Sequence, residues 1–88
     1  MRMTLCTRAV MRALADAGTD GTWGWALCLA TGMGNGTVYP ALERLLEHGM
    51  ATKSRETGAH PGRPARTYWR LTGEGMEQLA RVERGLVR

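Results

Sequence analysis

The stretch that decides the fold is Gly34-Asn35-Gly36-Thr37-Val38-Tyr39-Pro40-Ala41-Leu42-Glu43-Arg44-Leu45-Leu46-Glu47-His48-Gly49-Met50. It predicts a helix with one buried face, because its apolar residues recur at helical spacing: Val38, Leu42, Leu45 and Leu46. The opposite face is polar, and its first turns carry no acidic residue. Glycines on both sides of Asn35 leave backbone amides open at the helix start, where the dipole favours phosphate. The leading end therefore suits a polyanion, and Gly49 suits the helix end.

The neighbouring segments predict a helix before this one and a hairpin after it. The turn Thr31-Gly32-Met33-Gly34 joins the two helices tightly enough for a helix-turn-helix. Residues 50–57 and 66–71 alternate like two antiparallel strands around a loop rich in glycine and proline. The expected fold class is α+β, mainly α: a winged helix-turn-helix with three helices, a two-stranded wing and a C-terminal helix.

The 88 residues predict one domain, spanning 1–88. We expect the helix-turn-helix at about 22–48, the wing at about 51–71, and terminal helices at about 3–17 and 73–87. The longest nearly apolar run, residues 23–30, is too short to span a bilayer, so the expected location is cytoplasmic with no membrane partner.

Several motifs together are similar to one known family. The run Gly36-Thr37-Val38-Tyr39-Pro40-Ala41-Leu42 is followed at the expected distances by Gly62-Arg63-Pro64 and Leu71-Thr72. Over roughly residues 8–80 the chain resembles the PadR-like family of winged-helix transcriptional regulators, in the short form that lacks an extended C-terminal domain. The resemblance implies a sequence-specific DNA-binding repressor that binds an inverted-repeat operator as a homodimer. The third helix would enter the major groove, and the wing would reach the flanking backbone or minor groove.

The predicted DNA contacts come from two places. At the helix-turn-helix, Asn35 and Gly36 would offer backbone amides, Thr37 a hydroxyl and Tyr39 a phenol to phosphates or base edges. The Asn35 amide could also read an adenine edge or simply cap the helix. The family commonly has His-Gly-Tyr where this chain has Trp23-Gly24-Trp25, so Trp25 would stand near the DNA backbone or pack between helices.

The wing supplies the second set of contacts. The whole formal excess of positive charge, +4, falls within residues 51–70, where five cations accompany one carboxylate. Such a localised excess favours an anionic partner, although a solvated hairpin is the simpler alternative. Arg63, between a glycine and a proline, is expected to protrude from a stiffened loop tip and meet a phosphate or the minor groove. The candidate contacts are Lys53, Arg55, Arg63 and Arg66.

Both terminal helices carry wide apolar stripes, which suggest a second subunit. The residues expected at a dimer interface are Leu5, Val10, Leu14, Met76, Leu79 and Leu86. Related regulators bind planar hydrophobic ligands near such interfaces, so binding of a small hydrophobic effector is an open alternative. Trp23 and Trp25 are the candidate residues to line its pocket.

Other functions are weighed against DNA binding. A winged-helix module that docks a partner protein, or an architectural or recombination-directing DNA-binding protein, would share the fold. An enzyme is not expected, because neither histidine lies in a recognisable catalytic motif. Cys6 and Cys28 form no Cys-x-x-Cys pair and are expected in the core, and no metal or other cofactor is predicted.

Overall fold

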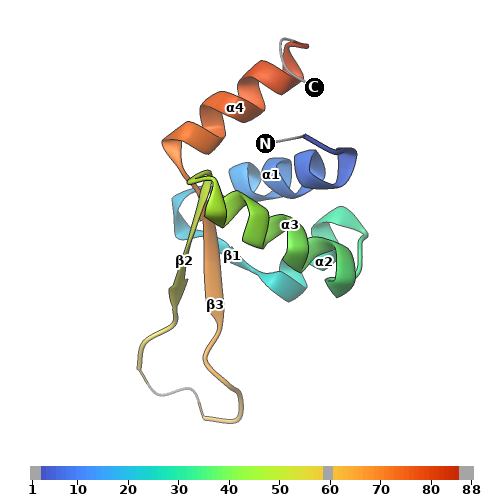
Figure 1. Cartoon of the computed structure of the whole chain (residues 1–88). Helices are drawn as coiled ribbons and strands as arrows, with labels where there is room; N and C mark the ends of the chain where they lie inside the picture. Colours follow the sequence, from blue (N-terminus) through green and yellow to red (C-terminus); the bar gives the residue numbers. More distant parts are fainter. Residues whose placement is uncertain (1–2, 59–60, 86–88) are drawn as a thin grey trace.

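The computed structural model describes residues 3–58 and 61–85. Helix α1 lies at the centre and contacts the other helices and the sheet (Figure 1). The helices are α1 (Leu5–Ala17), α2 (Gly24–Thr31), α3 (Asn35–Glu47) and α4 (Gly73–Glu83), with a 3-10 turn η1 (Gly18–Asp20). The strands are β1 (Thr22–Trp23), β2 (Ala51–Arg55) and β3 (Thr67–Leu71), in the antiparallel order β1-β3-β2. The predicted winged helix-turn-helix is confirmed.

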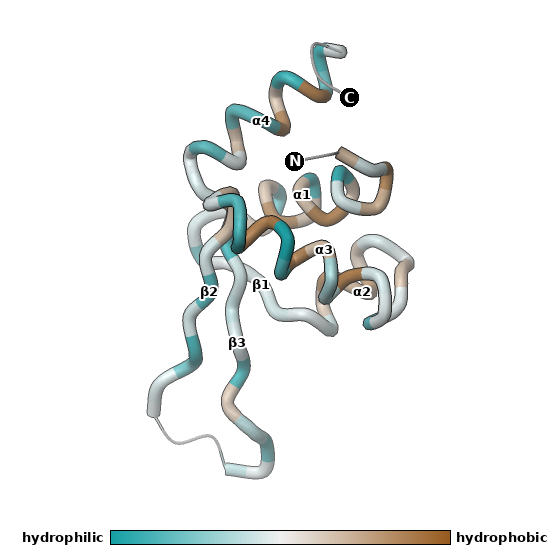
Figure 2. The backbone as a smooth tube through the Cα atoms, in the orientation of Figure 1, coloured by the Kyte–Doolittle hydropathy of each residue, from teal (hydrophilic) through white to brown (hydrophobic). Residues whose placement is uncertain are grey.

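The core fills the space between the helices and the base of the sheet. Apolar residues gather on the helices, whereas the β2–β3 hairpin is mostly hydrophilic or neutral and extends away from them (Figure 2). The buried apolar residues of the main cluster are Val10, Met11, Leu14, Leu27, Val38, Ala41, Leu42, Leu45, Ala51, Trp69 and Leu79. The hairpin therefore depends on its base for packing, and its outer part on polar contacts.

Threonine side chains cap the starts of two helices. In α1 the Thr7 amide donates to Thr4 Oγ1 at 3.1 Å, and in α4 the Gly75 amide donates to Thr72 Oγ1 at 3.0 Å. Gly49, with φ of 71°, ends α3 as predicted. Gly34 caps the start of α3 and has no side chain, so no capping side chain accepts from the free amides of the first turn.

Two boundaries differ from the expected ranges. Thr22 and Trp23 precede α2 as a short strand: the turn at Gly21, with φ of 79°, places them in extended conformation, where they pair with Trp69 and Tyr68. The sheet therefore has three strands instead of two. Helix α4 ends at Glu83 because Gly85 turns the chain with φ of 78°, not at about residue 87, which lies outside the described residues.

The buried stripe of α1 also differs from the predicted one. Thr7 and Met11 are buried, whereas Cys6, which was expected in the core, is exposed. Thr7 can be buried because its hydroxyl accepts a hydrogen bond from Thr4 Oγ1 at 2.9 Å. Cys28 is only partly buried.

Candidate nucleic-acid interface

The leading end of α3 presents its polar residues to solvent. Asn35, Gly36 and Thr37 are all exposed, and the first turn has no acidic residue. Pro40 has no N–H to give to the Gly36 carbonyl, so the proline weakens the helix at this end. The side chain of Asn35 is held by α2, because the Cys28 thiol donates to Asn35 Oδ1 over 3.2 Å. This contact ties the start of α3 to the end of α2 and leaves the amide nitrogen of Asn35 as a donor.

Tyr39 lies across the start of α2. Its ring and hydroxyl occupy the space where a Cβ of residue 24 would stand, so any residue other than glycine there would displace the Tyr39 side chain. Gly24 is buried beneath the ring, whereas Tyr39 is 41% exposed. Trp25, the next residue of α2, is 65% exposed and does not serve as a plug between helices. Both aromatic side chains therefore remain accessible to a partner.

Two predicted wing cations lie on aromatic rings. The Arg66 guanidinium lies over the Trp23 ring with Cζ 4.2 Å from the centroid, and Lys53 Nζ lies 5.4 Å from the Trp69 centroid. Lys53 also forms a long ion pair with Glu43 of α3, at 3.8 Å. Arg55 is exposed at the end of β2. Stacking restricts the first two side chains without neutralising them.

Arg63 is paired within the chain, which the sequence analysis did not predict. Its guanidinium binds both carboxylate oxygens of Glu56, at 2.7 and 3.1 Å, instead of standing free at the loop tip. Glu56 also accepts from the Arg66 amide at 3.0 Å and from the Tyr68 hydroxyl at 3.2 Å. Arg63 first, then these donors, lower the pKa of Glu56 to about 2, and the carboxylate raises the pKa of Arg63. This Glu56 cluster fastens the outer hairpin.

Arg70 was not expected to have a structural role. Its Nε donates to the Thr19 carbonyl at 2.8 Å, and its two terminal nitrogens donate to Ser54 Oγ at 2.8 Å and to the Asp20 carbonyl at 3.3 Å. The side chain therefore fastens the sheet to η1. The partners of Arg70 in the turn at residues 18–21 lie about fifty residues earlier, so no neighbouring residue in the sequence indicates this contact. Only the spacing of the predicted strands could have suggested it.

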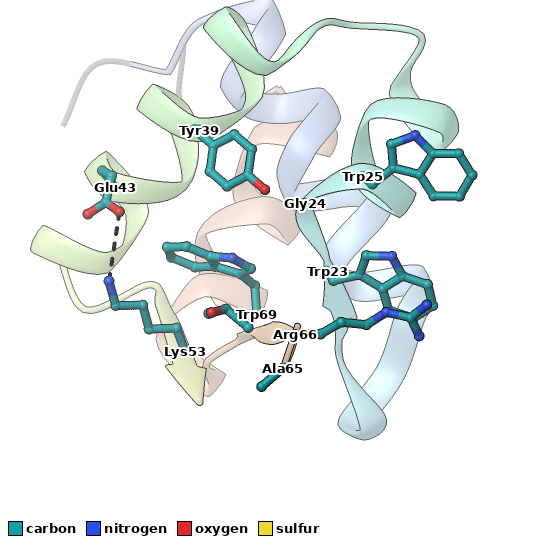
Figure 3. A pocket seen from close by; sticks show the side chains of 10 residues that line it. Trp23, Gly24, Trp25, Tyr39, Glu43, Lys53, Ala65, Arg66 and Trp69 are labelled. Carbon is teal, nitrogen blue, oxygen red and sulfur yellow. Dashed lines mark ion pairs between the residues drawn. The ribbon is translucent and has the colours of Figure 1, made fainter. Parts of the chain in front are cut away.

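A hollow of about 440 Å³ separates α3 and the start of α2 from the hairpin (Figure 3). The predicted contacts Trp25, Tyr39, Lys53 and Arg66 all line it, joined by Trp23, Glu43 and Trp69. Helix-turn-helix and wing candidates thus meet on one face. Trp23 and Trp25 do share a pocket, as the effector hypothesis required, but the pocket lies between α3 and the wing.

The predicted dimer residues divide into three groups. Val10, Leu14 and Leu79 are buried within the single chain, which leaves them no side-chain surface for a partner, so their assignment to the interface is corrected. Leu5 is 82% exposed and Met76 47% exposed. Met76 lines a small apolar hollow of about 250 Å³ between α1 and α4. Leu86 lies outside the described residues.

Within the described residues, no three histidine, cysteine or acidic side chains are placed together to hold a metal ion. The helices described in the structure are all too short or too polar to cross a membrane.

The fold and this face define a winged-helix DNA-binding protein, and comparison with known proteins gives the family. The transcriptional regulator PadR-like family matches residues 29–81, and the chain therefore belongs to it. Its members are DNA-binding transcriptional regulators and not enzymes. A search of the curated proteins found no match.

Solved structures agree with this assignment. A PadR family regulator from Eggerthella lenta is 30% identical, with a TM-score of 0.70 over 86% of this chain and 69% of that one. A PadR family regulator from Clostridium difficile is 18% identical, with a TM-score of 0.79 over 93% of this chain and 86% of that one, which shows the fold alone. The regulator PcaV from Streptomyces coelicolor is 26% identical, with a TM-score of 0.75, and 91% of this chain spans 54% of it.

Proposed function

We propose that the chain is a homodimeric repressor that binds an inverted-repeat operator, with α3 in the major groove and the wing on the flanking backbone or minor groove. The observation that carries this proposal is the shared face of α3 and the hairpin. The exposed, acid-free start of α3 lies beside a hollow lined by Tyr39, Lys53 and Arg66. Base contacts from α3 would set sequence preference, and the cations would add affinity that falls with salt.

The dimer belongs to the proposal because apolar surface remains on the terminal helices. Leu5 on α1 and Met76 on α4 are exposed, and the apolar hollow beside Met76 could accept a side chain of the second subunit. A two-fold dimer would place two α3 helices on successive turns of one duplex face, which is the symmetry that an inverted repeat requires. Leu5→Glu should therefore convert dimers to monomers, as judged by analytical ultracentrifugation.

A small effector is also part of the proposal. The PcaV regulator has been solved in complex with its natural ligand, at 22% identity to this chain and a TM-score of 0.70. That likeness concerns the fold alone, so the site of any effector has to come from this chain's own hollows.

The test is selection of bound duplexes from a random pool, followed by titration of the selected duplex against a scrambled one. An inverted repeat preferred by at least ~10³-fold is expected. Asn35→Ala should relax one position of the half-site by about 1–3 kcal/mol. Gln78→Ala, which removes an amide from α4, is the matched control and should leave the selected sequence unchanged. Equal weak binding to all duplexes would refute operator binding and favour a protein-docking module.

A further inference from the structure

Glu43 lies near the middle of α3, on the side of the helix opposite its buried face. Gly36, Pro40 and Glu43 follow one another at helical spacing along this outer ridge, and all three are exposed. Gly36 and Pro40 have no hydrogen-bonding side chain, and a Cβ at Gly36 would meet nothing within 4 Å. The leading part of the outer ridge is therefore low, which allows the helix to approach base edges closely. Glu43 is the first residue along the ridge whose side chain can form a hydrogen bond.

The ion pair with Lys53 does not explain why a carboxylate stands at this position. Lys53 Nζ lies 3.8 Å from Glu43 Oε1, and the two side chains are 46% and 52% exposed (Figure 3). Exposed pairs of this length add little to stability. With so weak a partner, the carboxylate would repel the phosphates of a duplex and weaken binding. Glu43 therefore needs a hydrogen-bond donor on the DNA when α3 enters the groove.

We infer that Glu43 is a specificity-determining residue, whose carboxylate accepts a hydrogen bond from the N4 amino group of a cytosine in the major groove. Cytosine presents only this donor there, whereas adenine places its N7 acceptor beside the N6 amino group. Guanine and thymine present acceptors, which repel a group that can only accept. The inference rests on the proposed function, because it requires α3 to lie in the major groove.

The base pair that Glu43 reads differs from the one that Asn35 reaches. The two residues are eight positions apart in α3, which is about 12 Å along the helix axis at ~1.5 Å per residue. Successive nucleotides of a strand are about 3.4 Å apart along the duplex, so this distance exceeds three base-pair steps. Substitutions of Asn35 and of Glu43 should therefore change different positions of the half-site.

The test is the duplex selection carried out with variants of Glu43. The unaltered chain should select a half-site with a cytosine that Glu43→Ala no longer requires. Glu43→Gln should select adenine at the same position, because a glutamine amide pairs bidentately with adenine N6 and N7. Glu47→Gln removes the same charge one turn further along α3 and should keep the cytosine. The same loss of preference in Glu47→Gln would reveal an effect of net charge alone and would overturn the inference.

Titration of single duplexes gives the magnitude. Replacing the selected cytosine in one half-site should weaken binding of the unaltered chain by about fivefold to a hundredfold. The same replacement should weaken binding of Glu43→Ala by less than about twofold. An equal penalty for both proteins, or an unchanged selected sequence in Glu43→Ala, would overturn the inference while operator binding stands. If the unaltered chain enriches no sequence, operator binding and cytosine recognition are refuted together.

Discussion

Gly24 begins α2 directly beneath Tyr39, and one added methyl group there should move that side chain. A Cβ at residue 24 would lie 3.0 Å from Tyr39 Cε1 and closer still to Cζ and the hydroxyl oxygen. Ordinary contacts between such atoms are about 3.5–4.0 Å, so the end of the ring must shift by more than about 1 Å. Because Tyr39 is 41% exposed, the ring can swing toward solvent without disturbing the core.

The size of the effect on DNA binding follows from the contact that is lost. A hydrogen bond from the Tyr39 hydroxyl to a phosphate would be charge-assisted, worth about 1.5–3 kcal/mol. Gly24→Ala should therefore weaken operator binding by between about tenfold and somewhat more than a hundredfold. Stability should change by less than about 1 kcal/mol, because alanine is the better helix residue and partly offsets the lost packing.

The assay is operator binding by fluorescence anisotropy, with thermal unfolding measured on the same samples. Gly73→Ala is the matched control: Gly73 is the first residue of α4, as Gly24 is of α2, and a Cβ at Gly73 meets nothing within 4 Å. It should leave DNA affinity unchanged. In a Tyr39→Ala background, Gly24→Ala should add no further loss, because both changes act through one side chain.

Two outcomes would refute this reasoning. If Gly24→Ala binds the operator as tightly as Gly73→Ala, the position of Tyr39 does not matter for binding. If Gly24→Ala and Tyr39→Ala weaken binding additively, Gly24 acts through the backbone of α2 and not through the ring.

The other predictions concern the wing and the start of α3. The stabilisation due to Glu56 should be complete above pH 4.5 and fall toward pH 2, because folding lowers the pKa of Glu56 to about 2. The melting temperatures of the unaltered chain and of Glu56→Gln should therefore converge as the pH falls. A constant difference between the two melting temperatures would contradict this. Arg55→Ala should reduce the salt slope of DNA binding by about 0.9, the effect of one phosphate contact. Arg63→Ala should reduce the slope less, because Glu56 already neutralises Arg63. Equal salt slopes for the two variants would count against this. Cys28→Ala should free Asn35 Oδ1 and alter base preference in the duplex selection without changing the salt slope; an unchanged selected sequence would show that the thiol does not orient Asn35.

Much of the fold could be predicted because it rests on local signals. The stripe of α3, the Gly49 stop and the Thr72 cap are set by residues within one or two helical turns. The start of α2 could not be predicted in the same way. Trp23 has a helical pattern on its carboxyl side, but its pairing with Tyr68 depends on a strand 45 positions later in the chain.

The sequence predicted which residue types form the candidate site better than it predicted which of them touch. The sequence places Tyr39 at the border of the polar face and leaves Trp25 either near the DNA backbone or packed between helices; both are exposed in the structure. It does not indicate that Tyr39 lies on Gly24, because that contact depends on how α2 crosses α3. The interface assignment of Val10 and Leu14 failed for a related reason: an apolar stripe does not say whether the partner is another helix of the same chain or a second subunit.

The positive charge of residues 51–70 shows most clearly why a count of cations along the sequence differs from the number of cations free to contact DNA. Counted along the chain, five cations are available to DNA, but Arg70 fastens η1 and Arg63 is held by Glu56. Of the remaining three, Arg55 is exposed and Arg66 lies over a ring that leaves its charge intact. Lys53 also lies over a ring, and its ion pair with Glu43 is long, at 3.8 Å, and about half exposed, so it is weak. Since counterion release depends on cations that reach phosphates, the wing should contribute a salt slope of about 2.7 per subunit instead of about 4.5. In the proposed complex, Arg63 and Arg70 would contribute indirectly, by holding the hairpin in the shape that brings the other three cations to the duplex.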